Sequence, residues 1–200
     1  MRLTVTSPYE NQPVSNWLNI TKRLIRRHPL AADEIVEIAL ASWVSIFAST
    51  IGNTFLIGRD IFPKPQIMGF FLHELIPLTL AKKYPDKWRK EEVASEKDLI
   101  YIPDDTFSVE IKTSSSSRNI YGNRSYAQEA NSVKKSKSGY YLAINFQHFS
   151  TKITKPKITI IRFGWLDHTD WKGQTAATGQ QARLSPNVEQ NKLITLYDLK

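Results

Sequence analysis

The sequence predicts an α/β (α+β) fold in which helices flank a mixed central β-sheet. Three observations support this fold: apolar residues at helical spacing in the first 90 residues, a strand pair over 98–112, and two strand-like segments at 140–146 and 157–166. A helical signal lies between the strand pair and residue 140. A strand, a helix and a strand in this order favour a right-handed crossover with parallel pairing, which makes the sheet mixed.

The first helix is predicted over 14–27, where Trp17, Ile20 and Leu24 share one face and Pro29 stops the helix. Its end is crowded with cations, and two interpretations remain open. They form either a solvated helix end, where positive charge is favourable, or a face that contacts phosphates. The cations are Lys22, Arg23, Arg26 and Arg27.

Two more helices are predicted before the strand pair. Residues 33–50 are apolar on almost every side, and 66–83 contain Pro77, which predicts a kink. The apolar run 35–51 is shorter than the roughly 20 residues of a membrane span, and it carries Glu37. We therefore interpret it as a buried helix.

A polar loop and then a helix-capping signal follow the strand pair. The loop spans 113–124, and Ser125 and Gln128 have the spacing of a capping box. This signal predicts a helix to about Lys137, which Gly139 would end.

The length predicts one domain over 1–200. A mainly helical part, 1–90, precedes the strand pair, crossover helix and strands of 95–166. The segment 167–200 is polar and rich in turn residues, except for 193–199, which resembles a final strand whose place in the sheet stays open.

The composition limits the classes of function. The chain has no cysteine, which excludes disulfides and thiolate metal sites and favours a reducing, cytoplasmic setting. The N-terminus lacks the apolar core of a signal peptide. A net charge of +8 favours an anionic partner, most often a nucleic acid, and an anionic membrane surface is the more distant alternative. No phosphate-binding glycine loop is visible, so no nucleotide cofactor is expected.

Charged residues of the strand pair form the main candidate site. Asp104 lies in a Pro-Asp-Asp turn, and roughly 10–15 Å of strand separate it from Glu110, so the two cannot share one metal ion. Asp98 fits instead, because a chain that folds back at 103–105 brings it opposite Glu110 on the same face. Lys112 shares that face by strand alternation. A turn of two or four residues would place Asp98 and Glu110 on opposite faces.

These residues suit metal-dependent hydrolysis of a phosphodiester. Asp98, Glu110 and the backbone carbonyl of Ile111 offer oxygen ligands to Mg²⁺, with Mn²⁺ able to replace it. Lys112 would orient or deprotonate the attacking water and offset negative charge in the transition state. The alternative is an exposed strand pair with an ion pair across it, since an acid two residues before a lysine is common in strands.

The pattern Asp98 … Glu110-Ile111-Lys112, followed by a helix and a strand, resembles the PD-(D/E)XK nuclease superfamily. Within it, "KDLIYIPDDTFSVEIKTSSSSRNIYGNRSYAQ" and "ATGQQARLSP" resemble type II restriction endonucleases of the ScaI-like family. This resemblance covers most of the chain, although Lys97-Asp98 stands where the superfamily pattern has Pro-Asp. It implies a restriction-endonuclease-like core and a Mg²⁺-dependent enzyme that cuts double-stranded DNA at a short palindrome.

The resemblance also implies that a preceding helix brings a further acid to the metal. Glu74, in "GFFLHEL", is the candidate, and Glu96 is a weaker alternative. Glu74 is equally explained as a surface residue paired with a lysine.

The loop after Lys112 is the candidate DNA-reading segment, because it is dense in side chains that contact phosphates and base edges. Arg118 and Arg124 suit guanine, and the Asn and Gln side chains suit adenine. The alternative is a solvated loop whose last residues only cap a helix. The full candidate set is Ser114, Ser115, Arg118, Asn119, Asn123, Arg124, Tyr126 and Gln128.

Other functions remain open: a junction resolvase or nicking enzyme of DNA repair or recombination, or a non-catalytic DNA-binding domain. The run "DHTDW" at 167–171 has no second histidine-rich segment to make a metal site with it.

One catalytic set cuts one strand, and a palindrome repeats its bases about a two-fold axis, so we expect a homodimer. Its interface would use part of 33–50, unless that helix is wholly buried.

Overall fold

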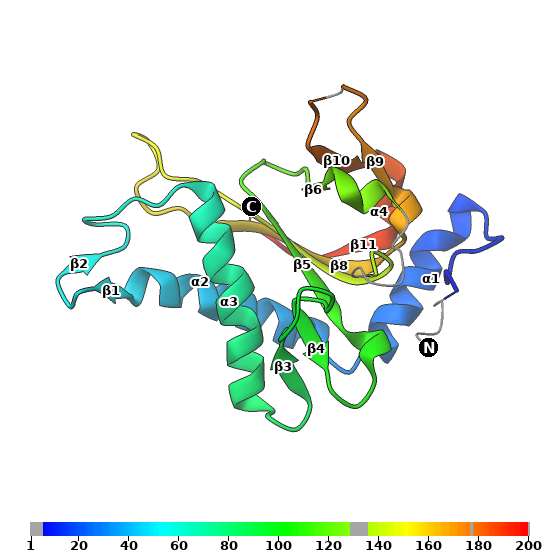
Figure 1. Cartoon of the computed structure of the whole chain (residues 1–200), viewed down its shortest axis with the longest axis horizontal. Coiled ribbons are helices and arrows are strands. Elements are labelled where there is room, and N and C mark those ends of the chain that lie inside the picture. The colour runs from blue at the N-terminus through cyan, green and yellow to red at the C-terminus, as the bar shows by residue number, and fades with distance from the viewer. Residues whose placement is uncertain (1–5, 129–135, 177, 200) are drawn as a thin grey trace.

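A six-stranded mixed sheet lies at the centre of the computed structural model, which describes residues 6–128, 136–176 and 178–199 (Figure 1). The strand order is β11-β8-β7-β5-β4-β3; β5 and β7 are parallel and the other neighbours are antiparallel. The predicted fold class is confirmed. The strands are β3 (Trp88–Lys90), β4 (Leu99–Tyr101), β5 (Val109–Ser114), β7 (Gly139–Phe146), β8 (Ile158–Leu166) and β11 (Leu193–Asp198).

Three helices pack on one face of this sheet. They are α1 (Val14–Arg27), α2 (Ala32–Ala48) and α3 (Pro65–Lys83), so the three predicted helices are confirmed, and α3 continues through Pro77. Alternate sheet residues, among them Ile111, Leu142 and Ile144, share a core with these helices. A short hairpin of β1 (Thr50–Ile51) and β2 (Phe55–Leu56) follows α2.

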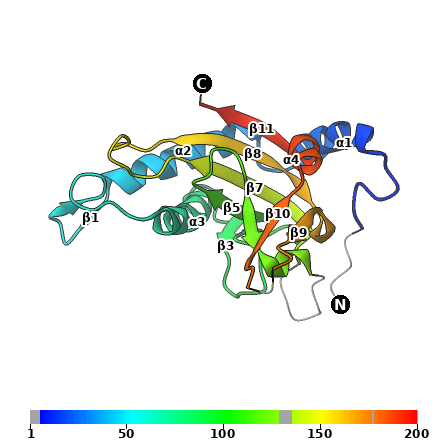
Figure 2. The ribbon, with the colours of Figure 1, turned by 90° about the horizontal axis from the view of Figure 1, so that it is seen from above.

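A second core lies on the opposite face. Figure 2 shows β9 and β10 on the side of the sheet away from α1 and α2. Tyr141 and Ala143 of β7 pack there against Trp171 and Ala182. The elements of this layer are β6 (Tyr121–Asn123), the 3₁₀ helices η2 (Arg124–Ala127) and η3 (His168–Asp170), β9 (Trp171–Gly173), β10 (Gln181–Leu184) and α4 (Pro186–Lys192). The described residues of the polar segment 167–191, which the sequence predicted to be rich in turns, thus cover this face of the sheet.

The hairpin has the predicted register but a different turn. Leu99 pairs with Val109, so Asp98 comes opposite Glu110, as the sequence predicts. The connection holds a 3₁₀ helix, η1 (Asp105–Phe107), in place of a tight three-residue turn. The Asp104 carboxylate caps η1 by accepting a hydrogen bond from the backbone N–H of Thr106.

The crossover between β5 and β7 differs from the prediction in its local structure. Parallel pairing of the two strands is confirmed. The helix expected from Ser125, however, is only the 3₁₀ helix η2, because Gln128 is already extended. Pairing of Asn123 with Gln181 in β10 ties the start of this segment to the small sheet. The rest of the predicted helix, 129–135, lies outside the described residues.

Two glycines permit close backbone contacts between layers. A side chain at Gly69 of α3 would meet the Thr113 hydroxyl of β5, and one at Gly164 of β8 would collide with the backbone of Lys192. Gly69 thereby lets α3 approach the strand that carries Glu110 and Lys112. Across the described ranges, no helix is long and apolar enough to cross a membrane.

Candidate active site

The hairpin brings the three predicted charges together. The Asp98 carboxylate accepts a hydrogen bond from the Ile111 backbone N–H at 2.6 Å. The Lys112 ammonium donates to Glu110 Oε1 at 2.7 Å and to the Ile111 carbonyl at 3.2 Å. In-register pairing with Tyr141 of β7 places Glu110 on the face of the second core.

Burial separates this arrangement from an exposed ion pair. The Glu110 side chain is 2% exposed, whereas those of Asp98 and Lys112 are 13% and 12% exposed. Burying an ionised carboxylate this deeply has a high cost in desolvation free energy unless cations and hydrogen-bond donors surround it. The exposed strand pair considered from the sequence is therefore wrong.

Two tyrosines cover the buried carboxylate. The Tyr126 hydroxyl donates a hydrogen bond to Glu110 Oε1. Burial raises the pKa values of both Tyr126 and Tyr141, and the negative charge of Glu110 raises them further, so both stay protonated. The Lys112 ammonium lies 4.5 Å from the centre of the Tyr126 ring. Tyr126, a candidate DNA contact from the sequence, thus lies in the carboxylate's own environment.

Helix α3 contributes a residue that the sequence analysis missed. His73 Nδ1 lies 3.6 Å from the Asp98 carboxylate. Its neighbour Glu74 instead accepts two hydrogen bonds from Lys90, at 2.7 and 2.6 Å. Glu96 is held by Arg89 at 2.6 Å. Helix α3 thus comes close to Asp98 through His73, one position before Glu74, and the role of Glu74 at the site stays a prediction.

The oxygen atoms of the hairpin suit a hard divalent cation. Within the described residues there is no group of three or more His, Asp and Glu side chains arranged to hold a metal. The candidate donors for a metal ion are therefore two carboxylates and one backbone carbonyl. The Lys112 ammonium bridges two of these oxygens, Glu110 Oε1 and the Ile111 carbonyl. Both oxygens therefore bind a cationic group, the Lys112 ammonium, in this structure. Together with Asp98 they form an all-oxygen donor set of the kind that Mg²⁺ prefers.

The family follows from comparison with known proteins. A family model described as ScaI restriction endonuclease matches residues 7–197. The chain belongs to the ScaI restriction endonuclease family. It is 46% identical over 196 residues to the type II restriction enzyme ScaI of Streptomyces caespitosus, and the match covers 97% of this chain and 86% of that protein. This ScaI family member is a type II site-specific deoxyribonuclease, and the predicted resemblance to this family is confirmed.

A buried polar network holds the loop that follows β5 in this ScaI family member. Arg162 of β8 is 2% exposed, and its guanidinium donates to the Arg118 carbonyl and, at 2.8 Å, to Asn145 Oδ1. The Asn145 amide donates to the carbonyls of Ser116, at 2.9 Å, and Asn119, at 3.1 Å. Two buried side chains thus fix three loop carbonyls and leave the Arg118 side chain exposed.

The predicted DNA-reading residues have different surroundings in this ScaI family member. Ser114 is buried, and its hydroxyl accepts a hydrogen bond from the Ser116 N–H. The Arg124 guanidinium donates to the carbonyls of Ala176, at 3.2 Å, and Gly179, at 3.4 Å. Arg124 therefore braces the loop before β10. Ser115 is partly buried, and the exposed candidates are Arg118, Asn119, Asn123 and Gln128.

Proposed function

We propose that the chain is a PD-(D/E)XK endonuclease that uses Mg²⁺, or Mn²⁺ in its place, to cut both strands of double-stranded DNA at a short palindrome. The observation that carries this proposal is the contact of Lys112 with both Glu110 and the Ile111 carbonyl, beside the hydrogen bond from Ile111 N–H to Asp98. All of these groups belong to one hairpin: three are side chains, and the Ile111 N–H and carbonyl are backbone groups of β5. We also propose that residues 1–200 act as one nuclease domain in the cytoplasm, consistent with the cysteine-free composition.

The residues have separate roles in this proposal. Asp98, Glu110 and the Ile111 carbonyl would hold the metal ion, which supplies an activated water and neutralises charge on the phosphate when bound. Lys112 positions its ammonium beside the same oxygens, where it orients the attacking water and offsets developing negative charge. The Tyr126 hydroxyl fixes the Glu110 carboxylate through its hydrogen bond.

We propose His73 as the main residue that α3 contributes to the site. His73 Nδ1 is close enough to Asp98 to orient that carboxylate, and its side chain is 31% exposed. Glu74 remains a proposed site residue, but Lys90 holds both of its oxygens. Glu74 would therefore act only after that ion pair opens.

The homodimer is proposed with an apolar surface near α2 and α3 as its interface. Within the described residues α2 buries one face in the core, and Val44 on its outer face is 66% exposed. Phe55, Phe62 and Phe70 are also more than half exposed, at 53%, 55% and 56%. Exposed aromatic side chains of this size are typical of contact surfaces. A second copy related by a two-fold axis would place one cleavage centre at each DNA strand.

Digestion of a mapped plasmid tests the proposed function. We expect double-strand cuts at one short palindromic sequence when Mg²⁺ is present and no cutting with EDTA. Sequencing of the ends identifies the site, and light scattering on the DNA complex gives the subunit number. A monomer that nicks one strand, or that prefers branched DNA, would instead identify a repair nuclease.

Arg118 and Arg124 are expected to differ when each is replaced with alanine. Arg118→Ala should relax or abolish the site preference, at a cost of about 1–3 kcal/mol if it makes a bidentate contact with guanine. Arg124→Ala should mainly lower stability, because this guanidinium contacts backbone carbonyls of the loop before β10. Cleavage of the mapped site and of sites that differ by one base pair measures the first effect, and thermal melting measures the second. Identical changes in cleavage preference for both variants would disprove the assignment.

A further inference from the structure

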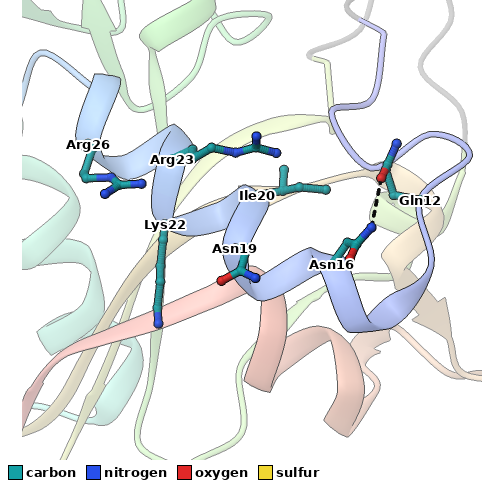
Figure 3. A pocket seen from close by; sticks show the side chains of 7 residues that line it. All are labelled: Gln12, Asn16, Asn19, Ile20, Lys22, Arg23 and Arg26. Atoms are coloured by element: carbon teal, nitrogen blue, oxygen red, sulfur yellow. Dashed lines mark hydrogen bonds between the residues drawn. The ribbon is translucent and has the colours of Figure 1, made fainter.

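Helix α1 presents a stripe of long polar side chains that no step of the cleavage reaction uses. The stripe consists of Asn16, Asn19, Arg23 and Arg26 of α1, at intervals of three, four and three residues, and of Gln12 just before the helix, which accepts a hydrogen bond from Asn16. All five side chains are exposed. They line a shallow hollow of about 520 Å³, which Figure 3 shows together with Lys22 and Ile20.

The charge of this segment has one sign. Residues 11–32 contain four Lys and Arg residues and no Asp or Glu. Among the described residues, Lys22, Arg23 and Arg26 make no ion pair. The cations at the end of α1 are also more numerous than a helix terminus needs, because the dipole effect is confined to the last turn.

The helix beneath the stripe is held rigidly. Ile20 and Thr21 on its inner face are buried, and the Thr21 hydroxyl donates to the Asn191 carbonyl at 2.7 Å. Buried Lys192 lies 4.4 Å from the centre of the Trp17 ring. The stripe is therefore a fixed surface whose outer side chains are available to a ligand.

The chemistry of the stripe fits the sugar-phosphate backbone of DNA. Arg guanidinium groups and Asn and Gln amides all donate hydrogen bonds to phosphate oxygens. A lipid surface is a poorer match, because an interfacial helix buries an apolar face in the membrane and the stripe carries none. The stripe extends about 15 Å from Asn16 to Arg26, at 1.5 Å per residue, which is long enough to follow several phosphates.

The position of α1 gives the stripe a direction. His28 directly follows α1, and its Nε2 atom lies 2.9 Å from the carbonyl of Phe107, which is three residues before Glu110. The Tyr140 hydroxyl, at the start of β7, lies 3.4 Å from the Leu24 carbonyl. The Arg26 end of the stripe is thus at the end of the sheet where Glu110 lies, and the Gln12 end points away from it.

We propose that the α1 stripe binds the phosphate backbone of duplex DNA that flanks the cleaved site. This proposal rests on duplex DNA being the substrate, but it does not depend on the assigned metal ligands or on the palindrome. The stripe adds affinity for long DNA without reading its sequence.

The test compares Arg23→Ala/Arg26→Ala with the unaltered enzyme, with Ca²⁺ in place of Mg²⁺ so that DNA stays intact. Binding is measured on a short duplex that just covers the mapped site, on a long duplex with flanks, and on a long duplex that lacks the site. We expect the affinity of the variant for both long duplexes to fall about tenfold, with a salt dependence weaker by about two in log–log slope. Binding of the short duplex in Ca²⁺ should stay unchanged, and so should its cleavage in a separate assay with Mg²⁺.

The matched control is Lys152→Ala/Lys155→Ala, which removes the same charge from the exposed loop between β7 and β8. We expect it to change binding little, and thermal melting should show that both variants remain folded. Unchanged binding of long DNA by the α1 variant, or an equal loss in the control, would overturn the proposal. Binding of phosphatidylserine vesicles that the α1 variant alone loses, with DNA binding intact, would assign the stripe to a membrane and overturn it as well. Because the long duplex without the site is tested separately, the result does not depend on whether a recognition site has been found.

Discussion

Glu110→Ala is expected to reduce Mg²⁺-dependent cleavage of DNA by about 10³-fold or more, because it removes a metal ligand and the partner of Lys112 at once. Lys112→Ala should have an effect of similar size. The Lys112 ammonium donates hydrogen bonds to Glu110 Oε1 at 2.7 Å and to the Ile111 carbonyl at 3.2 Å, so its removal takes a positive charge from both oxygens. Single-turnover cleavage of the mapped plasmid measures both variants.

DNA binding separates a catalytic effect from a loss of structure. In Ca²⁺, Lys112→Ala should bind DNA nearly as well as the unaltered enzyme, since only one of many cations is lost. Asp104→Asn is the matched control within the same hairpin, because the amide oxygen keeps the cap of η1, and it should leave cleavage nearly unchanged. If Asp104→Asn abolished cleavage while Asp98→Ala did not, the ligand assignment would be wrong.

Lys192→Met is expected to lower the free energy of unfolding by about 3–5 kcal/mol, because it leaves buried carboxylates without their cation. The Lys192 ammonium contacts Asp170 at 2.8 and 2.9 Å and Asp167 at 3.1 Å, and the three side chains are 4%, 7% and 9% exposed. It also lies 4.2 Å from the centre of the Tyr9 ring. Urea unfolding at neutral pH measures the loss.

The dependence on pH gives this prediction a second readout. Burial already raises the pKa of Asp170 in spite of the ammonium beside it. Without Lys192, the folded protein binds a proton at Asp170 more readily than the unfolded chain does, because the ammonium that lowers the pKa of this carboxyl is gone. The loss of stability in the variant should therefore shrink as the pH is lowered through the raised pKa of Asp170.

Neutral replacements provide the control for this ion cluster. Lys192→Met combined with Asp167→Asn and Asp170→Asn should recover much of the lost stability, because no uncompensated charge remains. Lys172→Met, an exposed lysine on β9, should have almost no effect. A Lys192→Met variant as stable as the unaltered protein at neutral pH would show that the cluster contributes nothing to folding.

The sequence determined the local elements and the hairpin pairing. Apolar spacing and Pro29 set α1 at Val14–Arg27, since helix periodicity and termination depend on neighbouring residues alone. The sequence also predicted the pairing of Asp98 opposite Glu110 for a chain that folds back at 103–105, whereas a turn of two or four residues would have placed the two side chains on opposite faces. The 3₁₀ helix η1 replaced the predicted tight turn without changing that register.

Only the tertiary structure decided which side chains surround the buried carboxylate and which hold the loop. Tyr126 reaches Glu110 because the chain between β5 and β7 folds over the sheet, and His73 reaches Asp98 because Gly69 lets α3 approach β5. Arg162 lies 44 residues after Arg118, whose carbonyl it binds. Lys192 likewise meets Asp170 from 22 residues away. No local pattern encodes such contacts, because they depend on how the whole sheet packs between its two cores. A charge buried there is tolerated only beside a compensating group, and that group comes from a part of the chain far away in the sequence.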